Sequence, residues 1–267
     1  MMQPLSALST QQLRGIKAVL TDIDDTLTTH GKLPALSYQA LEELRASGVS
    51  VIPVTGRPAG WCDMIARFWP VDGVVGENGA FYFRYREAEK RMDRIYAQDV
   101  ATRQANTATL WEIARRVLKD VPGTAIASDQ AYREIDVAID FAEDVPPLPL
   151  QEVQKIVTAF EARGATAKIS SIHVNAWFGA HDKLSMALRL LSEVCGISAK
   201  EAGSVVAYCG DSPNDAPMFG YFPLSIGVAN VKQFADRMEH LPSFVTEEEG
   251  GAGFAHFARL LLEARGQ

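Results

Sequence analysis

Apolar runs alternate with amphipathic stretches in the first part of the chain. Residues 17–22 (KAVLTD) and 49–56 (VSVIPVTG) are rich in aliphatic and β-branched side chains, as buried strands are. Residues 37–48 (SYQALEELRASG) instead repeat apolar side chains three and four positions apart, which indicates an amphipathic helix. A further helix over residues 60–69 and strands within residues 72–83 follow. This order predicts βαβ units, and therefore a parallel sheet with helices on both faces.

The same alternation returns late in the chain. Strands are expected within residues 204–211 and 224–230, and helices within residues 181–196, 214–221 and 231–238 and after the glycines at 250–253. The middle differs, because helices over residues 100–120 and 148–164 alternate along the chain with strands within 133–141 and 167–178. We therefore predict an α/β protein with a doubly wound, Rossmann-like parallel sheet. Its core is formed by residues 1–82 and 182–267, and residues 83–181 form an inserted α/β cap domain.

Composition narrows the class of protein. The chain has 267 residues, of which 47% are hydrophobic, so it can fill sizeable cores. A net charge of -7 without a basic run argues against nucleic acid or anionic membrane as a partner. The N-terminal residues lack a signal-peptide pattern and no apolar run approaches a membrane span, so a cytoplasmic location is expected. The three cysteines and five histidines show no spacing typical of a disulfide framework or a zinc site.

Polar residues stand in four clusters at predicted strand ends or helix starts. In chain order they are Asp22, Asp24 and Thr26; Thr55, Gly56 and Arg57; Lys183; and Asp211, Asn214 and Asp215. Ligands of open parallel sheets bind outside the carboxyl ends of the strands, so the four clusters are expected to converge on one crevice. Two carboxylates about 4 Å apart repel by roughly 4 kcal/mol at an effective dielectric constant of about 20. A crevice with this many carboxylates therefore favours a cation, and hard oxygen ligands suit Mg²⁺.

Each cluster also has a plain structural interpretation. Asp22, Asp24 and Thr26 could belong to a calcium loop, but Leu27 and Leu33 stand where an EF-hand loop needs Gly and Glu. Gly-Arg-Pro is ordinary turn chemistry, Asp182 before Lys183 is a typical helix cap, and residues 210–215 (GDSPND) also favour a turn. The functional interpretation therefore depends on the four clusters occurring together.

Taken together, the clusters resemble the haloacid dehalogenase-like superfamily of phosphotransferases. Its signatures are DxDx(T/V), a Thr or Ser at a strand end, a Lys, and an acidic GDxxxD pair, all present here in that order. Residues 76–80 (GENGA) and 225–236 (SIGVANVKQFAD) also resemble the Cof-like branch and its relatives, the sucrose phosphatase and mannosyl-3-phosphoglycerate phosphatase families. Asp25 departs from the pattern, since many of these relatives have Gly there.

The resemblance implies a role for each cluster. Asp22 would attack phosphorus to form an aspartyl-phosphate, and Asp24 would serve as general acid and base. Thr55 would form a hydrogen bond with the transferring phosphoryl group, and Lys183 would offset its negative charge. The implied substrate-binding residues are Thr26, Gly56, Arg57 and Asn214. The implied Mg²⁺ ligands are Asp22, Asp24 through its backbone carbonyl, Asp211 and Asp215.

The expected activity is Mg²⁺-dependent hydrolysis of a small phosphomonoester, such as a sugar phosphate or a phosphoglycerate derivative. The polar residues Arg133, Glu134, Lys168, Ser171, His173 and Asn175 are candidates for recognising its leaving group, although each fits a solvated strand face better. A phosphate-accepting receiver domain predicts a chain near half this length without an insertion. A sugar-phosphate sensor would not need the second carboxylate, Asp24. A phosphomutase or phosphotransferase of the same superfamily shares every residue named above and stays open.

Overall fold

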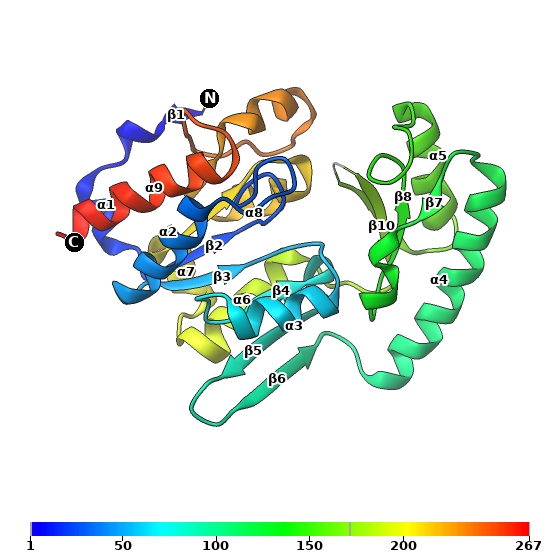
Figure 1. Cartoon of the computed structure of the whole chain (residues 1–267), viewed down its shortest axis with the longest axis horizontal. Helices are drawn as coiled ribbons and strands as arrows, with labels where there is room; N and C mark the ends of the chain where they lie inside the picture. The colour runs from blue at the N-terminus through cyan, green and yellow to red at the C-terminus, as the bar shows by residue number, and fades with distance from the viewer. Residues whose placement is uncertain (1, 171, 267) are drawn as a thin grey trace.

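A six-stranded parallel sheet forms the centre of the larger part of the molecule in the computed structural model, which describes residues 2–170 and 172–266 (Figure 1). Its strands, in spatial order, are β1 (Gln3–Pro4), β13 (Phe244–Val245), β12 (Leu224–Gly227), β11 (Val206–Gly210), β2 (Ala18–Thr21) and β3 (Ser50–Pro53). All neighbouring pairs in this sheet are parallel. The expectation of a doubly wound parallel sheet is confirmed.

Helices cover both faces of this sheet. On one face lie α1 (Thr10–Gly15), α2 (Ala35–Ala46), α3 (Ala59–Phe68) and α9 (Gly250–Arg265). On the other lie α6 (Lys183–Cys195), α7 (Ala199–Val205) and α8 (Ala216–Tyr221). Neighbouring residues of β2 alternate between the two hydrophobic clusters, with Val19 in the first and Leu20 in the second. This is why the strand reads as a continuous apolar run rather than as an alternation.

A three-stranded antiparallel sheet extends the core beyond β3. It consists of β4 (Val74–Gly76), β5 (Phe81–Arg86) and β6 (Arg91–Tyr96), and a single parallel bridge from Val54 to Val75 links it to the large sheet. Phe81 and Phe83 of β5 are buried in the first core cluster, so the β5–β6 hairpin packs on the core.

A four-stranded antiparallel sheet forms a second layer beside the core (Figure 1). Its order is β7 (Ala125–Ile126), β8 (Val137–Asp140), β10 (His173–Trp177) and β9 (Thr166–Ile169). The helices α4 (Val100–Asp120) and α5 (Leu150–Glu161) cover one face, and together they enclose a separate hydrophobic cluster. In Figure 1 these helices lie on the side away from the core, so the opposite face of the sheet is turned toward it.

Three local expectations need correction. Residues 231–238 belong to a 3-10 helix, η5 (Ala229–Arg237), rather than to an α-helix. The short helix α7 was not expected, although Ser198 and Glu201 form a capping box at its start. The segment 167–178 holds two antiparallel strands, β9 and β10, with Ser170 accepting the N–H of His173 at the bend. Among the described residues, no helix is both long enough and apolar enough to cross a membrane.

Candidate active site

The sequence-predicted polar clusters meet at one edge of the parallel sheet. Asp22 directly follows β2, Thr55 follows β3, and Asp211 follows β11, and these three strands are neighbours in the sheet. Because the strands are parallel, their carboxyl ends lie at the same edge. Asn214 and Asp215 reach the same edge from the 3-10 helix η4 (Pro213–Asp215).

Lys183 contacts two of the carboxylates at this edge. It is the first residue of α6, whose start is fixed by Asp182, since the Asp182 side chain accepts the N–H of Ser185. The Lys183 Nζ lies 2.8 Å from Asp22 Oδ1 and 2.9 Å from Asp215 Oδ1. Burial alone would lower the pKa of Lys183, but the Asp215 and Asp22 carboxylates raise it above its ordinary value. The residue is therefore a fixed positive charge between two carboxylates.

Asp215 organises the loop after β11. Its Oδ1 also accepts the Tyr208 hydroxyl at 2.5 Å, and its Oδ2 accepts the backbone N–H of Asp211 at 3.0 Å. Gly210 is required here, because a Cβ at that position would lie 2.6 Å from Asp215 Oδ2. These contacts hold the Asp211 backbone at the sheet edge.

Negative charge exceeds positive charge at this point. Carboxylate oxygens of Asp22, Asp211 and Asp215 lie within 4.8 Å of one another, with the Lys183 ammonium between two of them. Burial raises the pKa of Asp22 to about 7, against the lowering effect of Lys183. Burial and the neighbouring Asp215 and Asp22 also raise the pKa of Asp211. Three converging hard oxygen ligands with one ammonium fit a divalent cation such as Mg²⁺.

Two neutral groups orient the Asp211 carboxylate. The Thr26 hydroxyl lies 3.3 Å from its Oδ1, and Asn230 Nδ2 donates to its Oδ2 at 2.9 Å. Asn230 Nδ2 also donates to the backbone carbonyl of Asp25, so it ties the loop after β2 to Asp211. Thr26 was predicted to bind substrate, but it is fully buried and its contact is with Asp211. Asn230 lies within residues 225–236 (SIGVANVKQFAD), but nothing in the neighbouring sequence indicates its contact with Asp211.

Arg57 faces Asp24 across the crevice. Its Nε lies 3.1 and 3.0 Å from the two carboxylate oxygens of Asp24, and its Nη2 lies 2.9 Å from Oδ1. The same guanidinium lies 3.6 Å from both Asp129 and Glu143, which belong to the segment that carries the antiparallel sheet. Arg57 therefore links an aspartate of the DxD motif to the inserted segment.

A small cavity lies between the sheet edge and the open face of the antiparallel sheet. Its free volume is about 40 Å³. Its lining residues are Asp22, Asp24, Gly56, Arg57, Asn78, Arg133, Ser170, Ile172, His173, Asn175, Asp211, Ser212 and Asn214. The predicted residues Thr26, Thr55, Lys183 and Asp215 are buried outside this lining. Among the candidates for leaving-group recognition, Arg133, His173 and Asn175 line the cavity, Glu134 and Lys168 are exposed elsewhere, and Ser171 lies outside the described residues.

The wall of the cavity opposite the sheet edge is polar and internally paired. Arg133 Nη1 lies 2.9 Å from Asp136 Oδ1 and donates to the backbone carbonyl of Gly56 at 3.0 Å. Asn175 Nδ2 donates to Asp136 Oδ2 at 3.1 Å. His173 Nε2 lies 2.9 Å from Glu143 Oε2, but the geometry forms no hydrogen bond between them. Burial lowers the pKa of His173 to about 4. This wall therefore offers the ion-paired guanidinium of Arg133 and the neutral side chains of Asn175 and His173, rather than a surplus of positive charge.

No role was predicted for Glu77 or Asn78, which lie in the GENGA stretch at residues 76–80. Both have left-handed backbone conformations, with φ of 42° and 56°. The Glu77 carboxylate is fully buried and accepts four backbone N–H groups, at 2.7 to 3.0 Å, from Ala59, Glu134, Ile135 and Asp136. Asn78 lines the cavity. Their place between two glycines was the available signal, since such a segment is suited to unusual backbone conformations.

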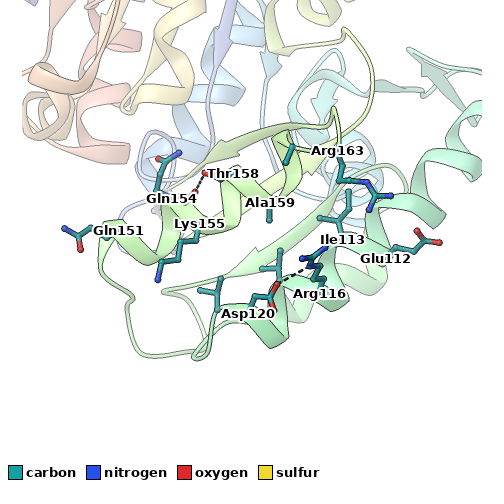
Figure 2. Close-up of a pocket in the computed structure, with 13 residues that line it drawn as sticks. Glu112, Ile113, Arg116, Asp120, Gln151, Gln154, Lys155, Thr158, Ala159 and Arg163 are labelled. Atoms are coloured by element: carbon teal, nitrogen blue, oxygen red, sulfur yellow. Dashed lines mark hydrogen bonds and ion pairs between the residues drawn. The ribbon is translucent and has the colours of Figure 1, made fainter.

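A second, larger groove lies between α4 and α5 (Figure 2). It has a volume of about 480 Å³ and is lined by side chains such as Ile113, Arg116, Lys155 and Thr158. Arg116 is paired with Asp120 at 3.2 Å, as Figure 2 shows. None of the sequence-predicted site residues that the structure describes lines this groove, so it is separate from the candidate active site.

Comparison with known proteins gives three kinds of similarity. The family of haloacid dehalogenase-like hydrolases matches residues 19–112. A phosphoglycolate phosphatase from Methanopyrus kandleri is 25% identical over 247 residues, which cover 92% of this chain and 97% of that protein. A phosphoglycolate phosphatase from Pyrobaculum neutrophilum is 27% identical over 252 residues, covering 93% and 96%.

Solved structures share the fold at lower identity. The C-terminal domain of a trehalose-6-phosphate phosphatase from C. albicans aligns with a TM-score of 0.69 and 14% identity, covering 98% of each chain. A haloacid dehalogenase-like hydrolase from Bacteroides thetaiotaomicron aligns with a TM-score of 0.62 and 16% identity, covering 91% of this chain and 98% of that one.

Proposed function

Because the chain is a phosphatase of the haloacid dehalogenase-like hydrolase family, we propose that it hydrolyses a small phosphomonoester through an aspartyl-phosphate intermediate. The observation that carries this proposal is the contact of one buried lysine, Lys183, with Asp22 and Asp215 at the carboxyl edge of the sheet. A carboxylate held beside an ammonium in a buried pocket is oriented as a nucleophile and can tolerate the approach of a phosphate anion.

The first step forms a bond between a carboxylate oxygen of Asp22 and phosphorus while the bond from phosphorus to the leaving oxygen breaks. Asp24 gives its proton to that leaving oxygen. In the second step Asp24 takes a proton from a water molecule, whose oxygen attacks phosphorus and releases Asp22 and inorganic phosphate. Asp24 thus reverses its role between the two steps, as general acid–base catalysis requires.

Arg57 must change partners for Asp24 to do this. In the structure it binds both oxygens of Asp24, which leaves neither oxygen free to carry the proton. We propose that an incoming phosphate group draws the guanidinium away from Asp24, since arginine binds phosphate with the same bidentate geometry. Thr55 and Gly56, in the same loop, would bind the phosphoryl oxygens, while Lys183 offsets their charge.

The metal in this proposal is Mg²⁺. Asp22, Asp211 and the backbone carbonyl of Asp24 would hold it, and Asp215, Asn214, Thr26 and Asn230 would support these ligands. When bound, the cation would offset the carboxylate repulsion and polarise the phosphoryl group. The converging oxygens of Asp22, Asp211 and Asp215 support this assignment.

The leaving group is proposed to be small and hydrophilic. The cavity of about 40 Å³ has room for roughly three water molecules, so as it stands it admits little more than the phosphate end of an ester. Arg57, Arg133 and Asn175 provide polar contacts at its wall. Phosphoglycolate, phosphoglycerate derivatives and sugar phosphates are all hydrophilic esters, and phosphoglycolate has the smallest leaving group of the three. The two archaeal relatives named phosphoglycolate phosphatase also favour it.

The division into a core (residues 1–82 and 182–267) and a cap (residues 83–181) is part of this proposal, as is a cytoplasmic location. The separate hydrophobic cluster of α4, α5 and their sheet supports an inserted cap. The β5–β6 hairpin falls largely within the cap range but packs on the core cluster, and it would serve as the base from which the cap extends.

The test is a phosphate-release screen over phosphoglycolate, phosphoglycerates, sugar phosphates and nucleotides, with and without Mg²⁺. We expect Mg²⁺-dependent release of inorganic phosphate, fastest for one of the small anionic or hydroxylated esters. A phosphomutase or phosphotransferase would pass the phosphoryl group to an organic acceptor. Transfer of the phosphoryl group to an organic acceptor, without release of inorganic phosphate, would therefore overturn the proposal.

A further inference from the structure

Asn78 has a buried amide nitrogen that no acceptor among the described residues satisfies. The residue is 7% exposed, it lines the cavity that Asp22 and Asp24 also line, and its Nδ2 has no hydrogen-bond partner within residues 2–170 and 172–266. Buried side-chain amides are normally hydrogen-bonded, and a buried donor left unpaired destabilises the folded protein. The donor is therefore explained if a ligand in the cavity accepts its hydrogen bond.

The surroundings of Asn78 include the Thr55–Gly56 loop, which is proposed to bind the phosphoryl oxygens. Its backbone N–H donates to the carbonyl of Thr55 at 3.1 Å. Its side-chain amide packs on the Cα of Gly56, where an added Cβ would lie 3.1 Å from Asn78 Oδ1 and 3.3 Å from Nδ2. On the other side, Gly79 packs so closely on the backbone of Asp182 and Lys183 that no side chain fits there. The segment Asn78–Gly79 therefore lies between the Thr55–Gly56 loop and the start of the helix that carries Lys183.

The backbone of this segment is held in an unusual conformation. Glu77, Asn78 and Gly79 have φ values of 42°, 56° and 99°. The left-handed region is unfavourable for a residue with a Cβ, and strain of this kind persists where the surrounding structure enforces it, often at ligand sites. Here the four N–H bonds to the Glu77 carboxylate and the bond from Asn78 N to Thr55 O fix it. The Asn78 side chain is thus prepositioned at the cavity wall.

We propose that Asn78 is a substrate-binding residue whose side-chain N–H donates to a non-bridging oxygen of the phosphoryl group. This rests on the proposed function and extends it, because it adds a neutral donor to the charged groups that surround the phosphate. An amide can present either its N–H or its C=O to a ligand, and toward an anionic oxygen only the N–H end forms a hydrogen bond. The contact is with the phosphoryl group rather than with the leaving group, so it is shared by every phosphomonoester.

The test separates this role from that of a residue kept only for its backbone conformation. Asn78→Gly removes the amide but suits a left-handed position better than Asn does. Asn78→Asp keeps the size and the tolerance for this conformation but replaces the donor with a negative charge. Lys90→Gly is the matched control, because Lys90 is another non-glycine residue with positive φ (49°) and lies exposed in the β5–β6 turn.

Two quantities are measured in the presence of Mg²⁺: kcat/KM for p-nitrophenyl phosphate, and the dissociation constant of inorganic phosphate by isothermal titration calorimetry. Losing a hydrogen bond to a charged group predicts a roughly 10- to 100-fold loss in both for Asn78→Gly, and at least as large a loss for Asn78→Asp. Lys90→Gly should match the wild type. If Asn78→Gly does not fold, Asn78→Asp decides.

Each outcome is decisive. Phosphate binding and turnover within twofold of the wild type in folded Asn78→Gly would overturn the inference and leave the proposed function standing. Losses confined to sugar phosphates, with inorganic phosphate bound normally, would place the contact at the leaving group and overturn it as well. If the wild type binds inorganic phosphate but hydrolyses no ester, and Asn78→Gly weakens that binding, the proposed function fails and the assignment of Asn78 holds. A wild type that binds no phosphate overturns both.

Discussion

The carboxylate of Glu77 accepts the backbone N–H of Ile135 at 2.7 Å, joining residues 58 positions apart in the chain. Glu77 follows β4 of the core, whereas Ile135 lies just before β8 of the inserted segment. The same carboxylate accepts the N–H of Ala59, at the start of the helix that follows Arg57. One buried side chain thus fixes the Arg57 loop and the loop that carries Arg133 relative to each other, and both arginines line the cavity.

Glu77→Gln should therefore destabilise the protein. The amide replaces one acceptor oxygen with an NH₂ group that faces backbone N–H donors, so about two buried N–H groups lose their acceptor. This predicts a loss of about 2–4 kcal/mol in the free energy of unfolding, measured by urea denaturation. Glu134→Gln is the control, because the Glu134 side chain is exposed while its own backbone N–H, which the substitution keeps, is one of those that Glu77 accepts. Equal stabilities for the two variants would contradict the structural role of Glu77.

Asp22→Asn and Asp24→Asn should each abolish or nearly abolish turnover of an aryl phosphate. The amide has no nucleophilic oxygen at position 22 and no proton-transfer capacity at position 24, where we expect a loss of roughly 100- to 10,000-fold in kcat. Asp22→Asn should be folded and at least as stable as the wild type, because it removes one of the clustered carboxylates. Phosphate-release assays and thermal melts check both statements, and wild-type turnover by Asp22→Asn would refute the mechanism.

Chelation of divalent cations should abolish phosphate release, and adding Mg²⁺ should restore it. Asp211→Ala should weaken Mg²⁺ binding at least about 10-fold by calorimetry, because it removes one of the clustered carboxylate ligands. Asp236→Ala, which removes an exposed carboxylate from the 3-10 helix η5, should leave Mg²⁺ binding unchanged. Full activity in excess chelator would contradict the metal requirement.

Substitutions in the cap should change substrate preference according to which residues line the cavity. His173→Ala and Asn175→Ala should alter the ranking of sugar phosphates and phosphoglycolate by kcat/KM, while the slow hydrolysis of an aryl phosphate changes little. Glu134→Ala and Lys168→Ala serve as controls, since both side chains are exposed away from the cavity lining. A parallel fall for every substrate would show that the cap supports the core rather than selecting the substrate.

His181 should make the protein less stable at mildly acidic pH. It is 9% exposed, neither ring nitrogen has a hydrogen-bond partner among the described residues, and burial lowers its pKa to about 4 although Asp182 acts in the opposite direction. The unfolded chain, with a histidine pKa near 6.5, binds more protons between these values, so the free energy of unfolding falls as the pH drops below about 6.5. Above about pH 7, His181 contributes no pH dependence to the free energy of unfolding.

The expected loss from His181 between pH 7.5 and pH 5 is about 1–2 kcal/mol. His181→Phe keeps an aromatic ring near Trp177, whose ring centroid lies 5.9 Å from that of His181, but cannot titrate. Urea unfolding at both pH values should show a smaller acid loss in this variant than in the wild type. His240→Asn, at an exposed position, should behave as the wild type does. An unchanged acid loss in His181→Phe would rule out His181 as its source.

The sequence by itself determined the core of the fold and the place of the chemistry. Continuous apolar runs such as residues 18–21 can be buried on both faces only in a covered parallel sheet, and the polar residues that follow such strands must share one edge. Asp22, Thr55 and Asp211 were therefore predictable neighbours although up to 189 positions separate them (211 − 22). The strand pattern alone predicts that these residues lie close together, because the carboxyl ends of neighbouring parallel strands lie at the same edge of the sheet.

Only the tertiary structure decided which partners these groups have and which face of the cap they meet. Alternation along 173–177 separates His173 and Asn175 from Val174 and Ala176, but it does not say which set faces the core until α4 and α5 cover the apolar set. The same holds for the contacts of Arg57 with Asp24 and of Glu77 with residues 134–136. These contacts join separate loops, whose approach depends on how the inserted segment packs on the core, and no pattern local to either loop encodes that packing.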